Sequence, residues 1–127
     1  MKVKKFKNTK ILDKDAKCNF VTEIDFNEDT KAPINFCLLL VFHQNETVYE
    51  IIKYDGSHGF CHVHKYFEKL NVEGEECLPT QINAKSILIF KKDIQDNWED
   101  YVTKYRRKWK IWISKNKSLL TCKLFNI

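Results

Sequence analysis

The sequence predicts an α+β fold, with an antiparallel meander of four to five strands and one long C-terminal amphipathic helix packed on it. Between residues 18 and 67, short segments rich in β-branched and aromatic residues alternate with turn-forming residues. Residues 91–112 instead carry apolar side chains at a three-four spacing, which is typical of an amphipathic helix. At 127 residues and 43% hydrophobic residues, the chain is long enough for a single domain, 1–127, with its own core.

Four strands are expected within the sheet region, 18–67. The run 34–43 is apolar on both faces and so predicts a central strand, and a short turn separates it from the strand on either side. The expected strands are 18–26, 34–43, 47–54 and 60–67. The flanking segments are a basic N-terminal arm (1–17), an acidic connector (69–80), a short strand or helix start (82–90) and a closing strand or docked tail (119–125).

The main helix is expected over residues 91–112. Its acidic residues come early and its basic residues late, an order that suits the helix dipole. The predicted apolar stripe consists of Ile94, Trp98, Tyr101, Tyr105, Trp109 and Trp112.

Charge divides the chain into two basic ends and an acidic middle. Residues 1–17 carry seven Lys against two acids, residues 18–90 five Lys against eleven acids, and residues 91–127 ten Lys or Arg against four acids. The basic ends are compatible with nucleic-acid binding. Five cysteines without a CxxC pair and no apolar leader predict a reduced, cytoplasmic protein, and no apolar run is long enough for a membrane span.

Three of the four histidines lie within seven residues, next to a glycine-bounded turn. Gly56 and Gly59 predict a tight reversal, and on the following strand His62 and His64 would project from one face. If 56–58 form a three-residue loop, Asp55 faces Gly59, Ile52 faces His62 and Glu50 faces His64.

Imidazoles titrate near neutral pH and also bind metals, so two kinds of chemistry remain open for this cluster. The first is metal-independent cleavage of RNA by paired acid/base histidines, with lysine charge and a tyrosine at the phosphate. Its catalytic candidates are His58, His62, His64, Lys53 and Tyr54, with Tyr66 also placed to orient the phosphate. The alternative needs no catalysis: zinc or another divalent ion is held by His62, His64, His58, Glu50 and Asp55. In a third reading the histidines only pack and hydrogen-bond.

The basic end of the helix predicts phosphate contacts, although a solvated charged face explains the same residues. The nucleic-acid-binding candidates are Arg106, Arg107, Lys108, Lys110 and Lys65. The aromatic residues of the same helix are regularly spaced, which favours a core position over base stacking. The sequence therefore predicts either an RNA-acting protein or a non-catalytic nucleic-acid-binding or structural module.

The stretch Lys53-Tyr54-Asp55, followed by His58-Gly59 and His62-Val63-His64, resembles the TumE-type toxins of prokaryotic toxin–antitoxin pairs. The resemblance extends to the downstream Asn97-Trp98-x-x-Tyr101 segment. It implies a sheet-plus-helix fold, an action on RNA and a small antitoxin protein as partner. A homodimer is a further expected assembly, because strands that are apolar on both sides need a second cover.

Overall fold

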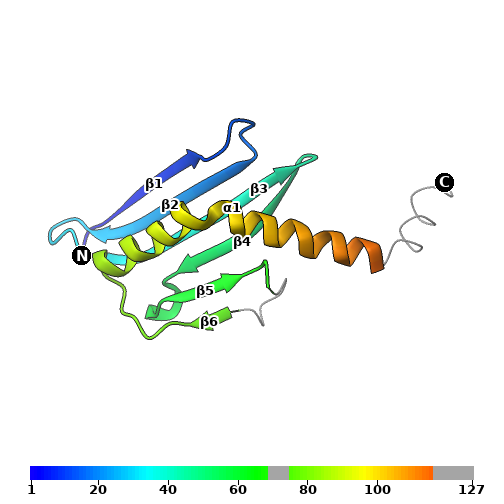
Figure 1. Cartoon of the computed structure of the whole chain (residues 1–127). Helices are drawn as coiled ribbons and strands as arrows, with labels where there is room; N and C mark the ends of the chain where they lie inside the picture. The colour runs from blue at the N-terminus through cyan, green and yellow to red at the C-terminus, as the bar shows by residue number, and fades with distance from the viewer. Residues whose placement is uncertain (69–74, 116–127) are drawn as a thin grey trace.

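The computed structural model describes residues 1–68 and 75–115, without the side chains of residues 58 and 109–115. The described residues form one six-stranded antiparallel sheet whose spatial order is the chain order. Its strands are β1 (Val3–Ile11), β2 (Cys18–Asn27), β3 (Pro33–Gln44), β4 (Thr47–Asp55), β5 (His62–Lys65) and β6 (Glu75–Cys77). A 3₁₀ turn, η1 (Ser57–Gly59), joins β4 to β5, and helix α1 (Ala84–Lys115) lies across one face of the sheet (Figure 1). The α+β meander is confirmed, but the sheet has six strands rather than four to five.

The first additional strand is β1, which corrects the expectation of a peripheral basic arm. It pairs with β2 along its whole length, and it is exposed throughout because it is an edge strand. Three of its lysines face acids of the next segment, in the pairs Lys4–Glu28 (3.6 Å), Lys5–Asp25 (3.9 Å) and Lys7–Glu23 (3.3 Å). Because exposed ion pairs contribute little, the backbone ladder holds this strand and the charges favour its register.

The second additional strand is β6, which lies within the segment expected as an acidic connector. Glu75, Glu76 and Cys77 pair with β5 and close the sheet at its other edge. Residues 69–74 of that connector lie outside the described part of the chain, as does the segment 119–125 that was expected as a closing strand or tail.

The hydrophobic core lies between the sheet and α1. Leu38, Leu40 and Ile52 from the middle strands are fully buried beneath the helix residue Ile94. The stripe predicted for the helix is confirmed at Ile94, Trp98, Tyr101 and Tyr105, which belong to or pack against this core. The side chains of Trp109 and Trp112 are outside the described set.

Helix α1 begins at Ala84, seven residues before the predicted start. The side chain of Asn83 accepts a hydrogen bond from the Ser86 backbone N–H at 2.8 Å, as a helix N-cap residue does. The following apolar run then contributes Ile87 and Phe90 to the core, so the segment expected as a strand or a helix start is the first turns of the helix. No helix in the described part of the chain has the length and apolarity to cross a membrane.

Side chains alternate between two faces of the sheet, and only one of these faces carries the helix. On the other face, cross-strand register sets one row of side chains across all six strands: Lys7, Glu23, Cys37, Asp55, His62 and Cys77. A second row runs beside it: Thr9, Val21, Leu39, Lys53, His64 and Glu75. We call this side of the sheet the open face, because α1 packs on the other side.

Candidate histidine–carboxylate site

The register of β4 and β5 places acidic and basic side chains opposite the histidines. Asp55 pairs with His62 and Lys53 pairs with His64. The expected pairs, with Ile52 and Glu50, are wrong because the connection contains η1 and its flanking residues rather than a three-residue loop. A shift by an odd number of positions exchanges the faces of a strand, so the side chains beside the histidines differ from those expected.

Both predicted histidines of β5 project onto the open face and reach a common carboxylate. The Nδ1 atom of His62 lies 3.0 Å from Oε1 of Glu75, and the Nε2 atom of His64 lies 3.8 Å from the same oxygen. Nε2 of His64 is also 3.6 Å from Oδ2 of Asp55. Two imidazoles and two carboxylates are thus brought together by three neighbouring strands.

The turn after β4 holds Asp55 in place. Its Oδ1 atom accepts a hydrogen bond from the Ser57 hydroxyl at 2.7 Å and one from the Ser57 backbone N–H at 3.3 Å. Because Oδ1 is used in this way, Oδ2 is the atom that faces His64 and lies 3.8 Å from Nζ of Lys53. The carboxylate therefore has a fixed orientation before any ligand arrives.

Lys53 supplies a positive charge next to His64. Burial alone would lower the pKa of Lys53, but Tyr66, Asp55 and Glu50 outweigh it and raise that pKa, so the amine stays protonated. Burial raises the pKa of Tyr66, while the charge of Lys53 and a hydrogen bond with it act in the opposite direction. The rings of His64 and Tyr66 stack at 5.7 Å.

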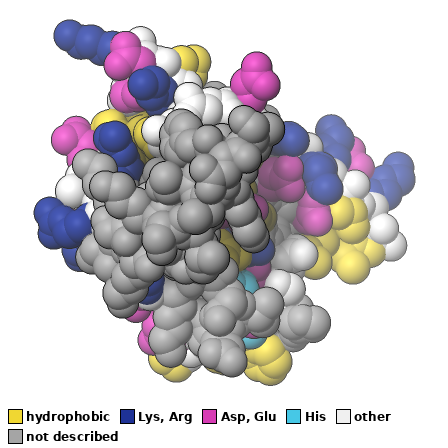
Figure 2. Space-filling view, turned by 90° about the vertical axis from the view of Figure 1, so that its right-hand side faces the viewer, with side chains coloured by type: hydrophobic (Ala, Val, Ile, Leu, Met, Phe, Trp, Pro, Cys, Tyr) yellow, Lys and Arg dark blue, Asp and Glu magenta, His cyan; other side chains and the backbone are white. Residues whose placement is uncertain are grey.

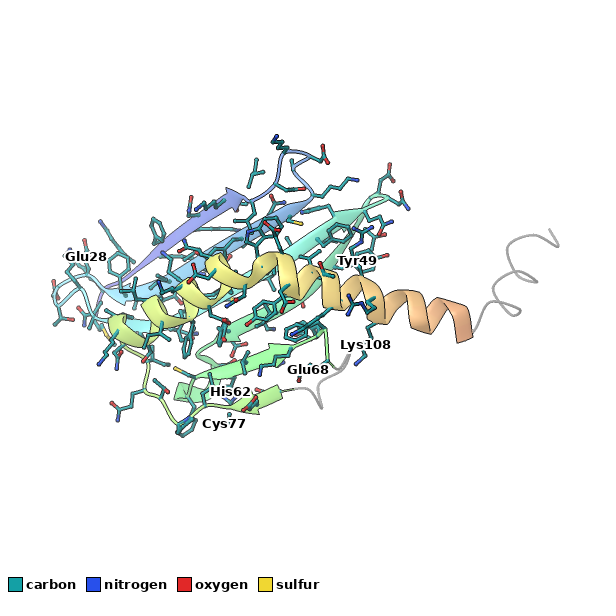
Figure 3. The ribbon with its side chains drawn as sticks, viewed as in Figure 1. Glu28, Tyr49, His62, Glu68, Cys77 and Lys108 are labelled. Atoms are coloured by element: carbon teal, nitrogen blue, oxygen red, sulfur yellow. The ribbon has the colours of Figure 1, made fainter. Side chains whose placement is uncertain are left out.

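The cluster is half-buried. Each histidine side chain is 12% exposed and that of Glu75 is 32% exposed, so small groups can reach it while its charges remain partly desolvated. In the side-chain view His62 and Cys77 lie together at the β6 edge of the sheet (Figure 3). Burial raises the pKa of Cys37, in the same row, to about 11, so this thiol is protonated at neutral pH.

Tyr54 is not brought together with His62 and His64. It belongs to the core face, where its ring stacks on Phe90 at 4.4 Å and its hydroxyl donates to Oδ2 of Asp93 at 2.7 Å. Burial first, and then the hydrogen bond and charge of Asp93, raise the pKa of Tyr54. Tyr101, which lies on the same helix as Asp93, donates to the other carboxylate oxygen of Asp93 at 2.7 Å. At this carboxylate the hydroxyl of Tyr54 is therefore the donor that comes from the sheet and ties the helix to it.

Two further predicted site residues, His58 and Glu50, are not placed beside His62 and His64 by the described structure. The backbone of His58 lies in η1, but its side chain is outside the described residues. Glu50 pairs with Val41 and lies beyond Lys53 from the histidines, so the structure does not place it opposite His64 as expected.

The predicted nucleic-acid-binding residues do not surround the histidines. Arg106 lies over the ring of Phe42 on the core side of the sheet, and Lys65 pairs with Glu76 at 3.8 Å on that same side. Arg107 is exposed on α1, and the helix residue Lys108 lies on the helix layer as well (Figure 3). The side chain of Lys110 is not described.

Charges on the open face are mixed, with a small excess of acids. Its described lysines are Lys5, Lys7 and Lys53, against Glu23, Asp25, Glu50, Asp55 and Glu75. Lysine or arginine (dark blue) and acidic (magenta) side chains are also interspersed in the end-on view of Figure 2, where a little histidine surface (cyan) is visible. Glu75 is not among the site residues that the sequence predicts, because its polar, acidic surroundings are typical of a connector. The signal for it in the sequence is its position shortly after a strand that carries two histidines.

In the part of the chain that the structure describes, fold and cluster together define a small α+β protein with a six-stranded antiparallel meander, one covering helix and a histidine–carboxylate group on the opposite face. Residues 1–111 match the model of a family described as a domain of unknown function, DUF7718, and the chain belongs to that family. No curated protein and no solved structure matches it.

Proposed function

We propose that this chain is a small, toxin-like cytoplasmic protein that cleaves RNA without a metal, using His62 and His64 as general acid and base. One observation carries the proposal: both imidazoles project from one strand onto one face, and each has a carboxylate oxygen within 4 Å. The resemblance to TumE-type toxins rests on the same stretch of sequence. It adds a small antitoxin protein as the expected partner.

The chemistry requires two proton transfers at one phosphodiester. One histidine takes the proton of the 2′-hydroxyl, whose oxygen bonds to phosphorus, and the other protonates the 5′-oxygen as its bond to phosphorus breaks. Glu75 and Asp55 lie next to the ring nitrogens and orient the rings, while Lys53 offsets the negative charge that develops on the phosphorane. Acid–base catalysis of this kind contributes about 10²–10⁴-fold.

The charge of the open face limits how RNA would bind there. Lys53 is the lysine next to the histidines, and acids surround it, so the site would engage about one phosphate rather than a long track. For single strands the slope of log K against log salt is about −0.7 per phosphate contacted, so one contacted phosphate gives an expected slope of about −0.7.

Cleavage of a single-stranded RNA in EDTA tests the proposal. Relative to the wild type, His62→Ala and His64→Ala should each lower the rate by about 10²-fold or more. His43→Ala is the matched control, because His43 lies at the far end of β3, opposite Val48. The His43→Ala protein should cleave RNA at the wild-type rate. Intact RNA after exposure to folded wild-type protein, or full activity of His64→Ala, would refute the proposal.

A non-catalytic nucleic-acid-binding module is the second candidate, and it is supported by a different surface. A groove of about 310 Å³ on α1 is lined by Val102, Thr103, Arg106 and Arg107. If RNA binds here, Arg106→Ala/Arg107→Ala weakens binding and reduces its salt dependence, while His62→Ala/His64→Ala leaves the affinity unchanged.

A further inference from the structure

We propose that His62, His64 and Glu75, with Asp55 as fourth donor, form a binding site for a divalent transition-metal ion of the zinc class. The site uses the residues of the proposed acid–base centre, but it does not require that the protein cleave RNA. The register of the sheet places Glu75 opposite His64 and Asp55 opposite His62, which brings both carboxylates into the donor set. This donor set replaces the one expected with Glu50.

The spacing of the donor atoms is close to that of a tetrahedral site. With metal–ligand distances of about 2.0–2.2 Å, neighbouring donors of a tetrahedral zinc ion lie about 3.3–3.6 Å apart. Three of the six donor–donor separations link the four residues, and they are 3.0 Å for Glu75–His62, 3.8 Å for Glu75–His64 and 3.6 Å for His64–Asp55. They bracket the required value, so small side-chain rotations would bring the donors to a common centre.

Such rotations are needed, because within residues 1–68 and 75–115 no three His, Cys, Asp or Glu side chains already form a ready-made metal site. The required change is small because the donors stand on three adjacent paired strands, and Ser57 already fixes the Asp55 carboxylate. Hydrogen bonding of a ligand carboxylate by a neighbouring residue is a common way to orient it for a metal.

Charge and ligand type favour a zinc-class ion over magnesium or calcium. Two imidazole nitrogens with two carboxylates suit zinc and its neighbours, whereas magnesium and calcium take mostly oxygen ligands. The acidic excess of the open face further attracts a cation, and the two carboxylates neutralise its charge. Lys53 next to Asp55 opposes this, so replacing it should strengthen the site.

Metal titration of the full-length protein tests the site without reference to activity. Reduced protein is titrated with Zn²⁺ against a chromophoric chelator, and with Co²⁺, whose visible absorption reports tetrahedral coordination. The expected result is one ion per chain, lost in His62→Ala/His64→Ala and weakened at least about 10–100-fold in Glu75→Gln, since even outer-sphere changes have effects of that size. Lys53→Met should bind more tightly than the wild type.

Cys77 gives the critical control, because it is an exposed cysteine that lies opposite His62 in the register of β5 and β6 and could itself bind zinc. Cys77→Ser should retain the wild-type affinity, and so should His43→Ala. Binding that survives His62→Ala/His64→Ala, or that depends on Cys77 and not on Glu75, would overturn the assignment, as would no binding at micromolar Zn²⁺ by folded protein. Circular dichroism of each variant establishes that it is folded.

The proposed metal site and the proposed RNA cleavage can be refuted independently of each other. Stoichiometric zinc with intact RNA leaves the metal site standing alone, and cleavage in EDTA by a protein that binds no zinc leaves the acid–base centre alone. If both hold, the metal uses the imidazole lone pairs that proton transfer needs. Zn²⁺ then inhibits cleavage, and EDTA restores it.

Discussion

Replacing Tyr54 by Phe should destabilise the protein without changing the open face. The substitution removes the hydroxyl that donates to Asp93 at 2.7 Å and leaves the ring stacked on Phe90 at 4.4 Å. A hydrogen bond to a charged group contributes about 1.5–3 kcal/mol, so the free energy of unfolding should fall by that amount. Tyr101→Phe removes the second hydroxyl at the same carboxylate, and the double variant should be non-additive because both share Asp93.

The same hydroxyls predict a loss of stability at alkaline pH. Burial first, and the bond to Asp93 second, raise the pKa of both Tyr54 and Tyr101, whereas a tyrosine in the unfolded chain has a pKa of about 10. Their contribution is therefore complete below that pH and is lost as pH rises above it, with a slope of about 1.4 kcal/mol per pH unit for each tyrosine. In the Tyr54→Phe protein, the contribution of one tyrosine to this alkaline loss of unfolding free energy should be absent.

Urea unfolding followed by circular dichroism, from neutral pH to about pH 11, measures both effects. The raised thiol pKa values of Cys18 and Cys37, each about 11, act equally in every variant and cancel in the comparison. A Tyr54→Phe protein within about 0.5 kcal/mol of wild type at all pH values would refute the reasoning. A Tyr54→Phe protein of unchanged stability that no longer cleaves RNA would restore this tyrosine as a catalytic candidate.

Three further predictions concern packing and thiol reactivity. Gly56→Ala should cost about 1–3 kcal/mol of unfolding free energy in urea, because its Cβ would lie 2.8 Å from two side-chain atoms; in Gly59→Ala, which has open space, any loss comes instead from its φ of +78°. Ile94→Ala should lose about 2–5 kcal/mol in the same assay, since Ile94 is fully buried where α1 packs on the sheet; wild-type stability would contradict the packing described. In timed alkylation read by mass spectrometry, Cys77 should react well before Cys37, whose partly buried thiol has a pKa raised to about 11; the reverse order would count against the register.

The central strand and the shared face of the histidines could be predicted because they follow from simple alternation. Leu38 and Leu40 are fully buried as the apolar run 34–43 indicated, and His62 and His64 do share a face. The register between strands could not be predicted in this way. It depends on the conformation of the β4–β5 connection, where η1 lengthens the loop, and no periodicity in the sequence reports that length.

The start of α1 and the two edge strands could not be predicted from the sequence for other reasons. The composition of segment 82–90 is compatible with either a short strand or the start of a helix, and tertiary packing of Ile87 and Phe90 together with the Asn83 cap makes it helical from Ala84. Strands β1 and β6 lie at the edges, where polar residues replace the apolar pattern that identifies a strand. Glu75 was overlooked for the same reason, and with it the carboxylate common to both histidines.

Placing the chemical groups on the far side of the sheet from the core separates two kinds of evolutionary pressure. Residues such as His62 and Glu75 can be exchanged without disturbing the helix–sheet packing layer. A lineage could therefore gain, alter or abandon an activity here while the chain continues to fold and accumulate normally. Family members that keep Ile94 and Tyr54 but differ at the open face would be natural variants of one scaffold with different functions.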